Sequence, residues 1–209
     1  MTAAPDQLRE RIVGALQHAI DGLDEGYAAP LRSHLRAEND SYDAAALCLG
    51  LGSIAGAEAK TTPCALTLGL LEEMGRVFMG LEDGSSISGV WGMPRTLNAA
   101  DGLYALAQHL LQTAEALDEA EKLAALSIFH DAARTFSEVL QAWSAGGAAE
   151  LQKAARSLYP AAASFASLCG GFEDSVRVGM LALAQEAADA PPDLAATLAR
   201  ASGLLLPKA

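Results

Sequence analysis

The chain has 209 residues and a formal net charge of −12, and 51% of its residues are hydrophobic while only 5% are aromatic. The apolar residues are weighted toward alanine and leucine, which favours helices over strands. The negative charge argues against nucleic acid or an anionic membrane surface as a partner, because both attract cationic faces.

A single domain covering residues 1–209 is expected, since a chain of this length can bury a substantial core. No apolar run approaches the length of a membrane span, and no secretory signal is visible at the N-terminus. The cysteines Cys48, Cys64 and Cys169 are far apart in the sequence and lie in apolar segments, so we expect buried free thiols. A cytoplasmic location is therefore expected.

Apolar residues recur at helical spacing along nearly the whole chain, with short breaks between the repeats. The pattern predicts an all-α fold, an antiparallel bundle of about eight helices. The predicted helices are 6–26, 44–59, Thr62-Pro63 to Glu82, 97–117, 121–144, 149–169, 173–189 and a last helix that starts at Pro191-Pro192.

Residues that commonly begin or end helices set these predicted boundaries. Gly26 is expected to end the first helix, and Pro30 to reinforce that break. The other boundary predictions are N-caps at Ser41, Thr62 and Thr96 and a kink at Pro160.

Three polar or glycine-rich features are expected to have structural rather than catalytic roles. The glycines of Gly50-x-Gly52-x-x-x-Gly56 do not follow a strand, so we expect them to let two helices approach closely rather than bind a dinucleotide. Glu72-Glu73 is interpreted as part of a solvated helix face. Asp101 lies close to an apolar stripe, and a buried carboxylate there would need hydrogen-bond donors.

Two stretches point to a known family: Met79-Gly80-Leu81-Glu82-Asp83-Gly84, and Trp91-Gly92-Met93-Pro94 with the following Leu97 to Ala107. The second stretch resembles the trans-isoprenyl diphosphate synthases (polyprenyl synthetases), in which a Trp-Gly turn leads into Asn-Ala-Gly-Asp and a leucine- and alanine-rich helix. The resemblance covers roughly residues 40–190. It implies a helical bundle of the isoprenoid synthase type.

The metal-binding motifs that the resemblance implies are degraded in this chain. The family's Asp-Asp-x-x-Asp falls on Met79, Gly80, Leu81, Glu82 and Asp83, so only the last aspartate is kept. The second aspartate-rich motif falls near Gln185-Glu186-Ala187-Ala188-Asp189 and is not intact. The paired arginines that follow the first motif in the family are missing, since no basic residue lies between Gly84 and Met93.

These losses affect the chemistry that the resemblance implies. Mg²⁺ prefers several oxygen ligands in octahedral geometry, but adjacent residues such as Glu82 and Asp83 point about 100° apart around a helix. Glu186 and Asp189, three residues apart, share a face. Each lost cation removes about 4 kcal/mol of diphosphate stabilisation at 4 Å. We therefore assign no catalytic residue, metal ligand or cofactor, and expect Mg²⁺ only if residual prenyltransferase activity exists.

Two functions remain open besides an active Mg²⁺-dependent prenyltransferase, the least favoured possibility. The first is a non-catalytic synthase homologue, a dimerising or regulatory subunit in isoprenoid biosynthesis. It would form a homodimer, or a heterodimer with an active prenyl synthase. The resemblance implies an interface on helices 97–117 and 121–144, and the apolar residues expected to supply it are Leu103, Leu110, Phe129 and Phe136.

The second function is a repurposed terpenoid-binding protein, or one that converts a terpenoid without metal. An apolar prenyl ligand would lie in a cavity, with Glu82, Asp83 or Glu186 as a possible acid. The residues predicted to bind it are Phe78, Met79, Met93, Asp101 and Met180.

Overall fold

The computed structural model describes residues 3–37, 42–83, 89, 91–141, 148–189 and 193–205. Every secondary-structure element in these ranges is a helix, which confirms the all-α prediction. The helices are α1 (Pro5–Asp21), α2 (Glu25–Ala37), α3 (Asp43–Ile54), α4 (Glu58–Asp83), α6 (Met93–Thr113), α7 (Glu119–Gln141), α8 (Ala148–Arg156), α9 (Tyr159–Gly170), α10 (Asp174–Asp189) and α11 (Leu194–Leu205).

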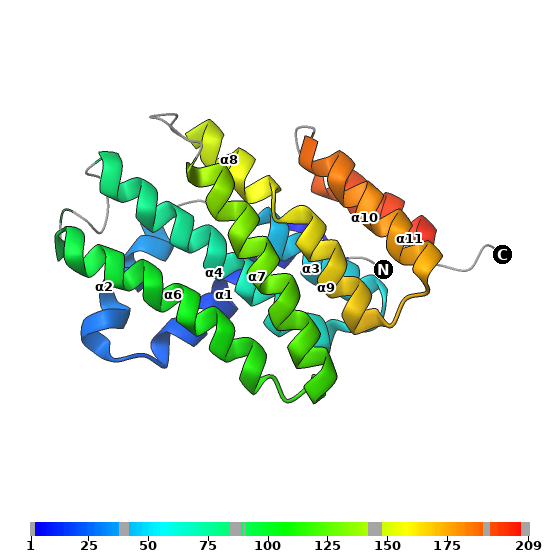
Figure 1. Ribbon diagram of the computed structural model, residues 1–209, viewed down its shortest axis with the longest axis horizontal. Helices are drawn as coiled ribbons and strands as arrows, with labels where there is room; N and C mark the ends of the chain where they lie inside the picture. The colour runs from blue at the N-terminus through cyan, green and yellow to red at the C-terminus, as the bar shows by residue number, and fades with distance from the viewer. Residues whose placement is uncertain are drawn as a thin grey trace.

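The helices pack side by side as a bundle, with the pair α10 and α11 at one end and α2 at the other (Figure 1). Two helices form the centre: α4 packs against α3 and α6, and α9 packs against α3, α4, α7 and α10. None of the helices described above is long and apolar enough to cross a bilayer.

The middle of α4 is enclosed on all sides, since residues 64–77 are buried without interruption. Apolar residues occupy every face of this segment, among them Leu68, Leu71, Met74 and Val77. A helix that is apolar all round belongs in a core, so the charged residues that share this segment are buried with it.

The glycines of α3 allow the close helix packing that the sequence predicts. A Cβ atom on Gly52 would lie 1.9 Å from Thr61 Oγ1 and 2.6 Å from Thr61 Cβ on α4. A Cβ atom on Gly50 would lie 2.7 Å from Leu198 Cδ2 on α11. Larger residues at these two positions would push α3 away from both neighbours.

The first predicted break is wrong in position. Helix α1 already ends at Asp21, and α2 continues through both Gly26 and Pro30. The reason is an unpredicted helix cap: the Asp24 carboxylate accepts a hydrogen bond from the Gly26 N–H at 3.0 Å. An aspartate in this position commonly starts a helix.

Two further helices begin earlier than predicted. Helix α4 begins at Glu58, and Pro63 lies in its second turn, where it removes only the hydrogen bond to the Ala59 carbonyl. Helix α6 begins at Met93, so Thr96 is not a cap. Thr96 lies buried in the first turn instead, and its hydroxyl donates to the Gly92 carbonyl at 3.0 Å. The predicted cap Ser41 lies outside the described residues.

The predicted kinked helix 149–169 is in fact two helices. Helix α8 ends at Arg156 and α9 starts at Tyr159, with Pro160 in the first turn of α9. Proline is favoured there because the first-turn N–H groups have no partner within the helix.

Three of the four residues expected to supply a dimer interface are core residues. Leu103, Phe129 and Phe136 are fully buried within the chain, and Leu110 is partly buried. Phe129 stacks near Tyr104 with ring centroids 5.2 Å apart. The apolar stripes of α6 and α7, which were predicted to face a partner, face their own bundle instead.

Candidate functional site

Five charged side chains gather where α1, α3 and α4 meet, and they are the strongest candidate site in the described part of the chain. We call Arg9, Asp43, Glu72, Glu73 and Arg76 the central charge cluster. Glu72 and Glu73 are each 1% exposed and Arg76 is 6% exposed. The interpretation of Glu72-Glu73 as a solvated face is therefore wrong, because the surrounding segment of α4 is enclosed.

Arg76 lies between two carboxylates and an aromatic ring. Its Nη1 donates to Glu73 Oε2 at 3.0 Å, and its Nη2 lies 3.5 Å from Glu72 Oε2. The guanidinium carbon is 4.3 Å from the centroid of the Tyr42 ring, a cation–π distance. The Tyr42 hydroxyl donates to Glu73 Oε2 at 2.9 Å.

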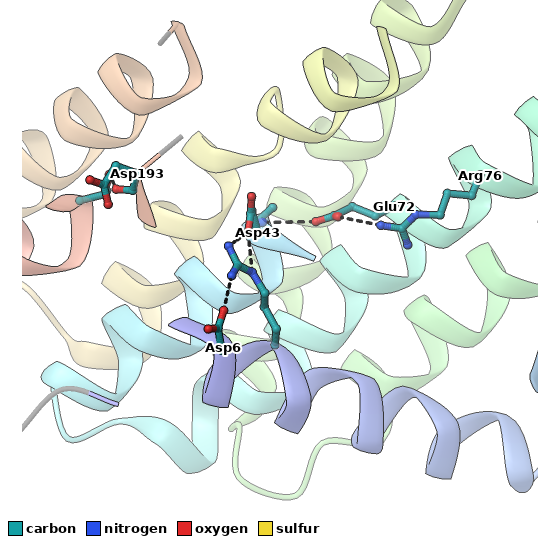
Figure 2. Close-up of polar contacts among 8 residues, drawn as sticks. Asp6, Asp43, Glu72, Arg76 and Asp193 are labelled. Atoms are coloured by element: carbon teal, nitrogen blue, oxygen red, sulfur yellow. Dashed lines mark hydrogen bonds and ion pairs between the residues drawn. The ribbon is translucent and has the colours of Figure 1, made fainter. Parts of the chain in front are cut away.

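The other half of the cluster holds the beginning of α3. Glu72 Oε1 accepts a hydrogen bond from the Ala44 N–H at 3.3 Å. Arg9 donates to Asp43 Oδ1 through Nε at 2.9 Å and Nη2 at 2.7 Å. Figure 2 shows Glu72 between Asp43 and Arg76, with Asp6 on the α1 side. Carboxylates near a helix N-terminus interact favourably with its dipole, so the cluster fixes α3 against α1 and α4.

Tyr42 is the N-cap of α3 and has an unusual backbone. Its φ of 37° is in the left-handed region, which is uncommon for a residue other than glycine. Burial raises the pKa of its hydroxyl, and the Glu73 charge raises the pKa further. The hydroxyl therefore stays a neutral hydrogen-bond donor, and its contacts to Glu73 and Arg76 hold the strained turn in place.

Tyr159, the first residue of α9, contributes a second buried hydroxyl. Only 2% of the residue is exposed, and its hydroxyl has no hydrogen-bond partner among the described residues. Burial, followed by the charges of Asp43 and Glu72, raises the pKa of this hydroxyl. A buried polar group without a partner is destabilising.

The two tyrosines give a matched prediction. Tyr159→Phe is expected to leave the free energy of unfolding unchanged or raise it by about 1 kcal/mol, because it removes an unsatisfied hydroxyl. Tyr42→Phe is expected to lower it by about 1–3 kcal/mol, because it removes a donor to a buried carboxylate. Urea unfolding followed by circular dichroism measures both. Equal losses in the two variants would contradict the different roles assigned here.

The cluster is arranged to hold structure rather than to transfer protons. Its guanidinium groups are paired with carboxylates and stay protonated, and its α4 members are closed to solvent. Arg76 is three and four residues before Met79 and Gly80, so all three lie on one face of α4. The Arg76 guanidinium is thus one helical turn before the stretch that resembles the first metal motif.

The first degraded motif lies at the end of α4. Met79 is partly buried there, as is Phe78. Glu82 and Asp83 occupy the last turn, and their side chains fall outside the part that the structure describes. Across the described residues, no three histidine, cysteine, aspartate or glutamate side chains converge to form a metal site.

The second degraded motif lies on the exposed face of α10. Glu186 forms a two-pronged ion pair with Arg200 of α11, with both N–O distances at 2.8 Å. The hydrogen bond from Arg200 lowers the pKa of Glu186. Asp189, one turn later, accepts a weak hydrogen bond from Gln185 at 3.4 Å. Glu186 is therefore already paired with a cation of its own chain, the Arg200 guanidinium.

The residues predicted to bind a prenyl ligand do not gather in one place. Met93 is 61% exposed at the start of α6, whereas Met180 is buried beside Leu47 and Thr197. Asp101 is exposed, so the expectation of a buried carboxylate is wrong. Burial raises the pKa of the Tyr27 hydroxyl, and the negative charge of Asp101 raises it further.

A pocket of about 350 Å³ lies elsewhere, between α7, α9 and α10. Its walls combine hydroxyl, amide and carboxylate groups with small apolar side chains. The lining residues are Ile128, Asp131, Ala132, Thr135, Ser157, Pro160, Ala161, Ser164, Gln185 and Ala188. None of them was among the residues predicted to bind a prenyl ligand, because they come from separate helices. Two of them, Gln185 and Ala188, belong to the second degraded motif.

Comparison with known proteins gives structural matches without sequence matches. No protein-family model matches the chain, and no curated protein matches it significantly. A geranylgeranyl pyrophosphate synthetase from the archaeon Geoglobus acetivorans matches with a TM-score of 0.69 and 16% identity over 86% of this chain. A polyprenyl synthetase from Streptomyces coelicolor A3(2) matches with a TM-score of 0.69 and 18% identity, also over 86%.

A third solved structure, the geranylgeranyl pyrophosphate synthetase from Pyrococcus horikoshii Ot3, matches over 96% of this chain with a TM-score of 0.57 and 12% identity. The match covers 84% of that protein, but the matches above cover only 64% of the Geoglobus chain and 60% of the Streptomyces chain. At such low identities the likeness concerns the fold. The chain has the all-helical fold of the trans-isoprenyl diphosphate synthases, as its sequence resemblance implies.

Proposed function

We propose that this chain is a non-catalytic isoprenyl diphosphate synthase homologue that acts as a dimerising or regulatory subunit. The central charge cluster carries this proposal. Prenyl transfer needs carboxylates that are open to Mg²⁺ and cations that are open to diphosphate. In this chain Glu72, Glu73 and Arg76 are enclosed and engaged with one another, one to two turns before the first degraded motif.

The charge balance supports the same function. The cluster holds three carboxylates against two guanidinium groups, a formal charge of −1, within a chain of net charge −12. A diphosphate near this region would meet an excess of negative charge, at about 4 kcal/mol for each like-charge pair 4 Å apart. On α10, Arg200 further neutralises Glu186, which would otherwise be available to a metal ion.

The partner surface that we propose lies on α6. Met93 and Leu97 are one turn apart there, 61% and 40% exposed. A second copy of the chain would bring another net charge of −12, so a less acidic active prenyl synthase is the partner that the charge favours.

The test combines the purified chain with each active prenyl synthase of the same organism and measures complex formation, condensation rate and product chain length. We expect one of these synthases to bind the chain and to change its rate or product length. Leu97→Asp should weaken that complex at least tenfold, because a charge would replace an apolar contact. Val178→Asp on α10, at a residue 62% exposed, is the matched control and should have no effect.

Two outcomes would contradict this proposal. One is a chain that stays monomeric with every synthase and changes no rate or product length. The other is an equal loss of binding in the two aspartate variants, which would show that the α6 surface has no special role.

The pocket between α7, α9 and α10 favours one second candidate, a terpenoid-binding protein. Its volume of about 350 Å³ is at the lower end of the range for small-molecule sites. Ala161 lines this pocket. Binding of geraniol or farnesol that is abolished by Ala161→Trp, without any effect on a synthase, would favour this function over the regulatory one.

A further inference from the structure

The three cysteines, far apart in the sequence, are brought together by the fold. Cys48 on α3, Cys64 on α4 and Cys169 on α9 are buried and free, which confirms the prediction of buried thiols. They are not scattered, however, since the sulfur atoms of Cys64 and Cys169 are only 3.9 Å apart. Helices α4 and α9, which form the centre of the bundle, meet at this thiol pair.

We propose that Cys64 and Cys169 form a redox-active modification site, which a small hydroperoxide converts into a disulfide that links α4 to α9. This inference is independent of the proposed regulatory function. A disulfide needs the two sulfur atoms at about 2.05 Å, so the gap of 3.9 Å must close by roughly 2 Å. Side-chain rotation with a small backbone shift can supply a movement of that size.

Both cysteines lie near helix ends, where the backbone can adjust. Cys64 follows Pro63 in the second turn of α4, where the backbone lacks one hydrogen bond. Cys169 is in the last turn of α9, which ends at Gly170. The next residue, Gly171, has a φ of 61° and closes the helix.

The two thiols are not equivalent, and Cys169 is expected to react first. Cys169 is 7% exposed, whereas Cys64 and Cys48 are fully buried. The hydrogen bond with Cys64 lowers the pKa of Cys169 and outweighs burial and the Glu121 charge, which raise it; the nearby Lys60 ammonium also lowers it. The same hydrogen bond, together with burial, raises the pKa of Cys64. The thiolate is the reactive form, so it forms preferentially on the more accessible sulfur.

The reaction has two balanced steps. The Cys169 thiolate attacks one oxygen of hydrogen peroxide, the O–O bond breaks, and hydroxide leaves, so that Cys169 becomes a sulfenic acid. The Cys64 sulfur then attacks the Cys169 sulfur, and the sulfenic oxygen leaves as water with the Cys64 proton. In sum, two thiols and one peroxide give one disulfide and two waters, and peroxide is the oxidant. A dithiol reductant reverses the modification.

The cross-link would join residues 105 positions apart in the sequence. A disulfide that closes such a long loop restricts the unfolded chain strongly. We therefore expect the oxidised chain to have a melting temperature higher by about 5 °C or more.

The test treats the intact chain with hydrogen peroxide near one equivalent and then blocks the remaining thiols with an alkylating reagent. Intact mass should fall by two hydrogen atoms before alkylation, and only one thiol should remain free. Peptide mapping should join the Cys64 and Cys169 peptides, with Cys48 alkylated. Dithiothreitol should restore the original mass and melting temperature.

Three variants define the order of events. Cys48→Ala is the control from the same buried group and should leave the cross-link unchanged. In Cys64→Ala the Cys169 sulfenic acid should accumulate and be trapped by dimedone, whereas Cys169→Ala should give neither product. A wild-type chain that forms only sulfinic acids, only intermolecular disulfides, or a link to Cys48 would overturn the proposal. The measurement on the wild-type chain does not depend on whether any variant folds.

Discussion

Replacing Arg76 by methionine is expected to lower the free energy of unfolding by about 3–5 kcal/mol. Methionine keeps much of the length and apolar volume of arginine, but Glu72 and Glu73 lose the guanidinium that lies between them. Both carboxylates are 1% exposed, so water cannot replace the lost partner. The Tyr42 ring also loses the cation that it covers. Urea unfolding of the wild type and the variant measures the effect.

Arg134→Met is the matched control on the surface of the same bundle. Arg134 pairs with Glu138 at 2.8 Å, one turn along α7, but the two side chains are 62% and 61% exposed. Its loss is expected to cost at most about 1 kcal/mol, because water screens exposed pairs. Adding Glu72→Gln and Glu73→Gln to Arg76→Met should recover part of the stability. Equal losses in Arg76→Met and Arg134→Met would contradict the role given to the cluster.

The fold could be predicted because its main signals are local. In α1 the apolar residues at helical spacing, Leu8, Ile12, Leu16 and Ile20, are all buried as the pattern predicts. The resemblance around Trp91 to Ala107 implied the bundle type that the solved structures share. The predicted helix boundaries were wrong where another residue determined the end of the helix. Asp24 starts α2 although Gly26 and Pro30 follow it.

The candidate site could be predicted only in part. Glu72, Glu73 and Arg76 have the spacing of helical ion pairs, which the sequence displays. Their burial depends on α3, α6 and α9 enclosing α4, and no local pattern encodes that packing. One signal was available, since apolar residues such as Leu71 and Val77 surround the acidic pair on all faces of the helix. A charged residue in such a helix is buried rather than solvated.

The thiol pair shows the same limit more clearly. Cys64 and Cys169 are 105 residues apart, and neither neighbourhood contains a motif that marks a partner. Their contact arises only because α4 and α9 pack against each other at the centre of the bundle. Contacts between distant segments follow from the packed structure, and local patterns in one sequence do not reveal them.

The most direct test of the central claim is a condensation assay on the purified chain alone. The chain is incubated with isopentenyl diphosphate, Mg²⁺ and an allylic diphosphate (dimethylallyl, geranyl or farnesyl), and prenyl products are extracted and quantified. The enclosed charge cluster predicts no Mg²⁺-dependent product above the protein-free blank. Asp83→Asn, which removes the last aspartate of the first degraded motif, distinguishes the chain from a contaminating synthase. Mg²⁺-dependent product at about one turnover per second, lost in Asp83→Asn, would contradict the account.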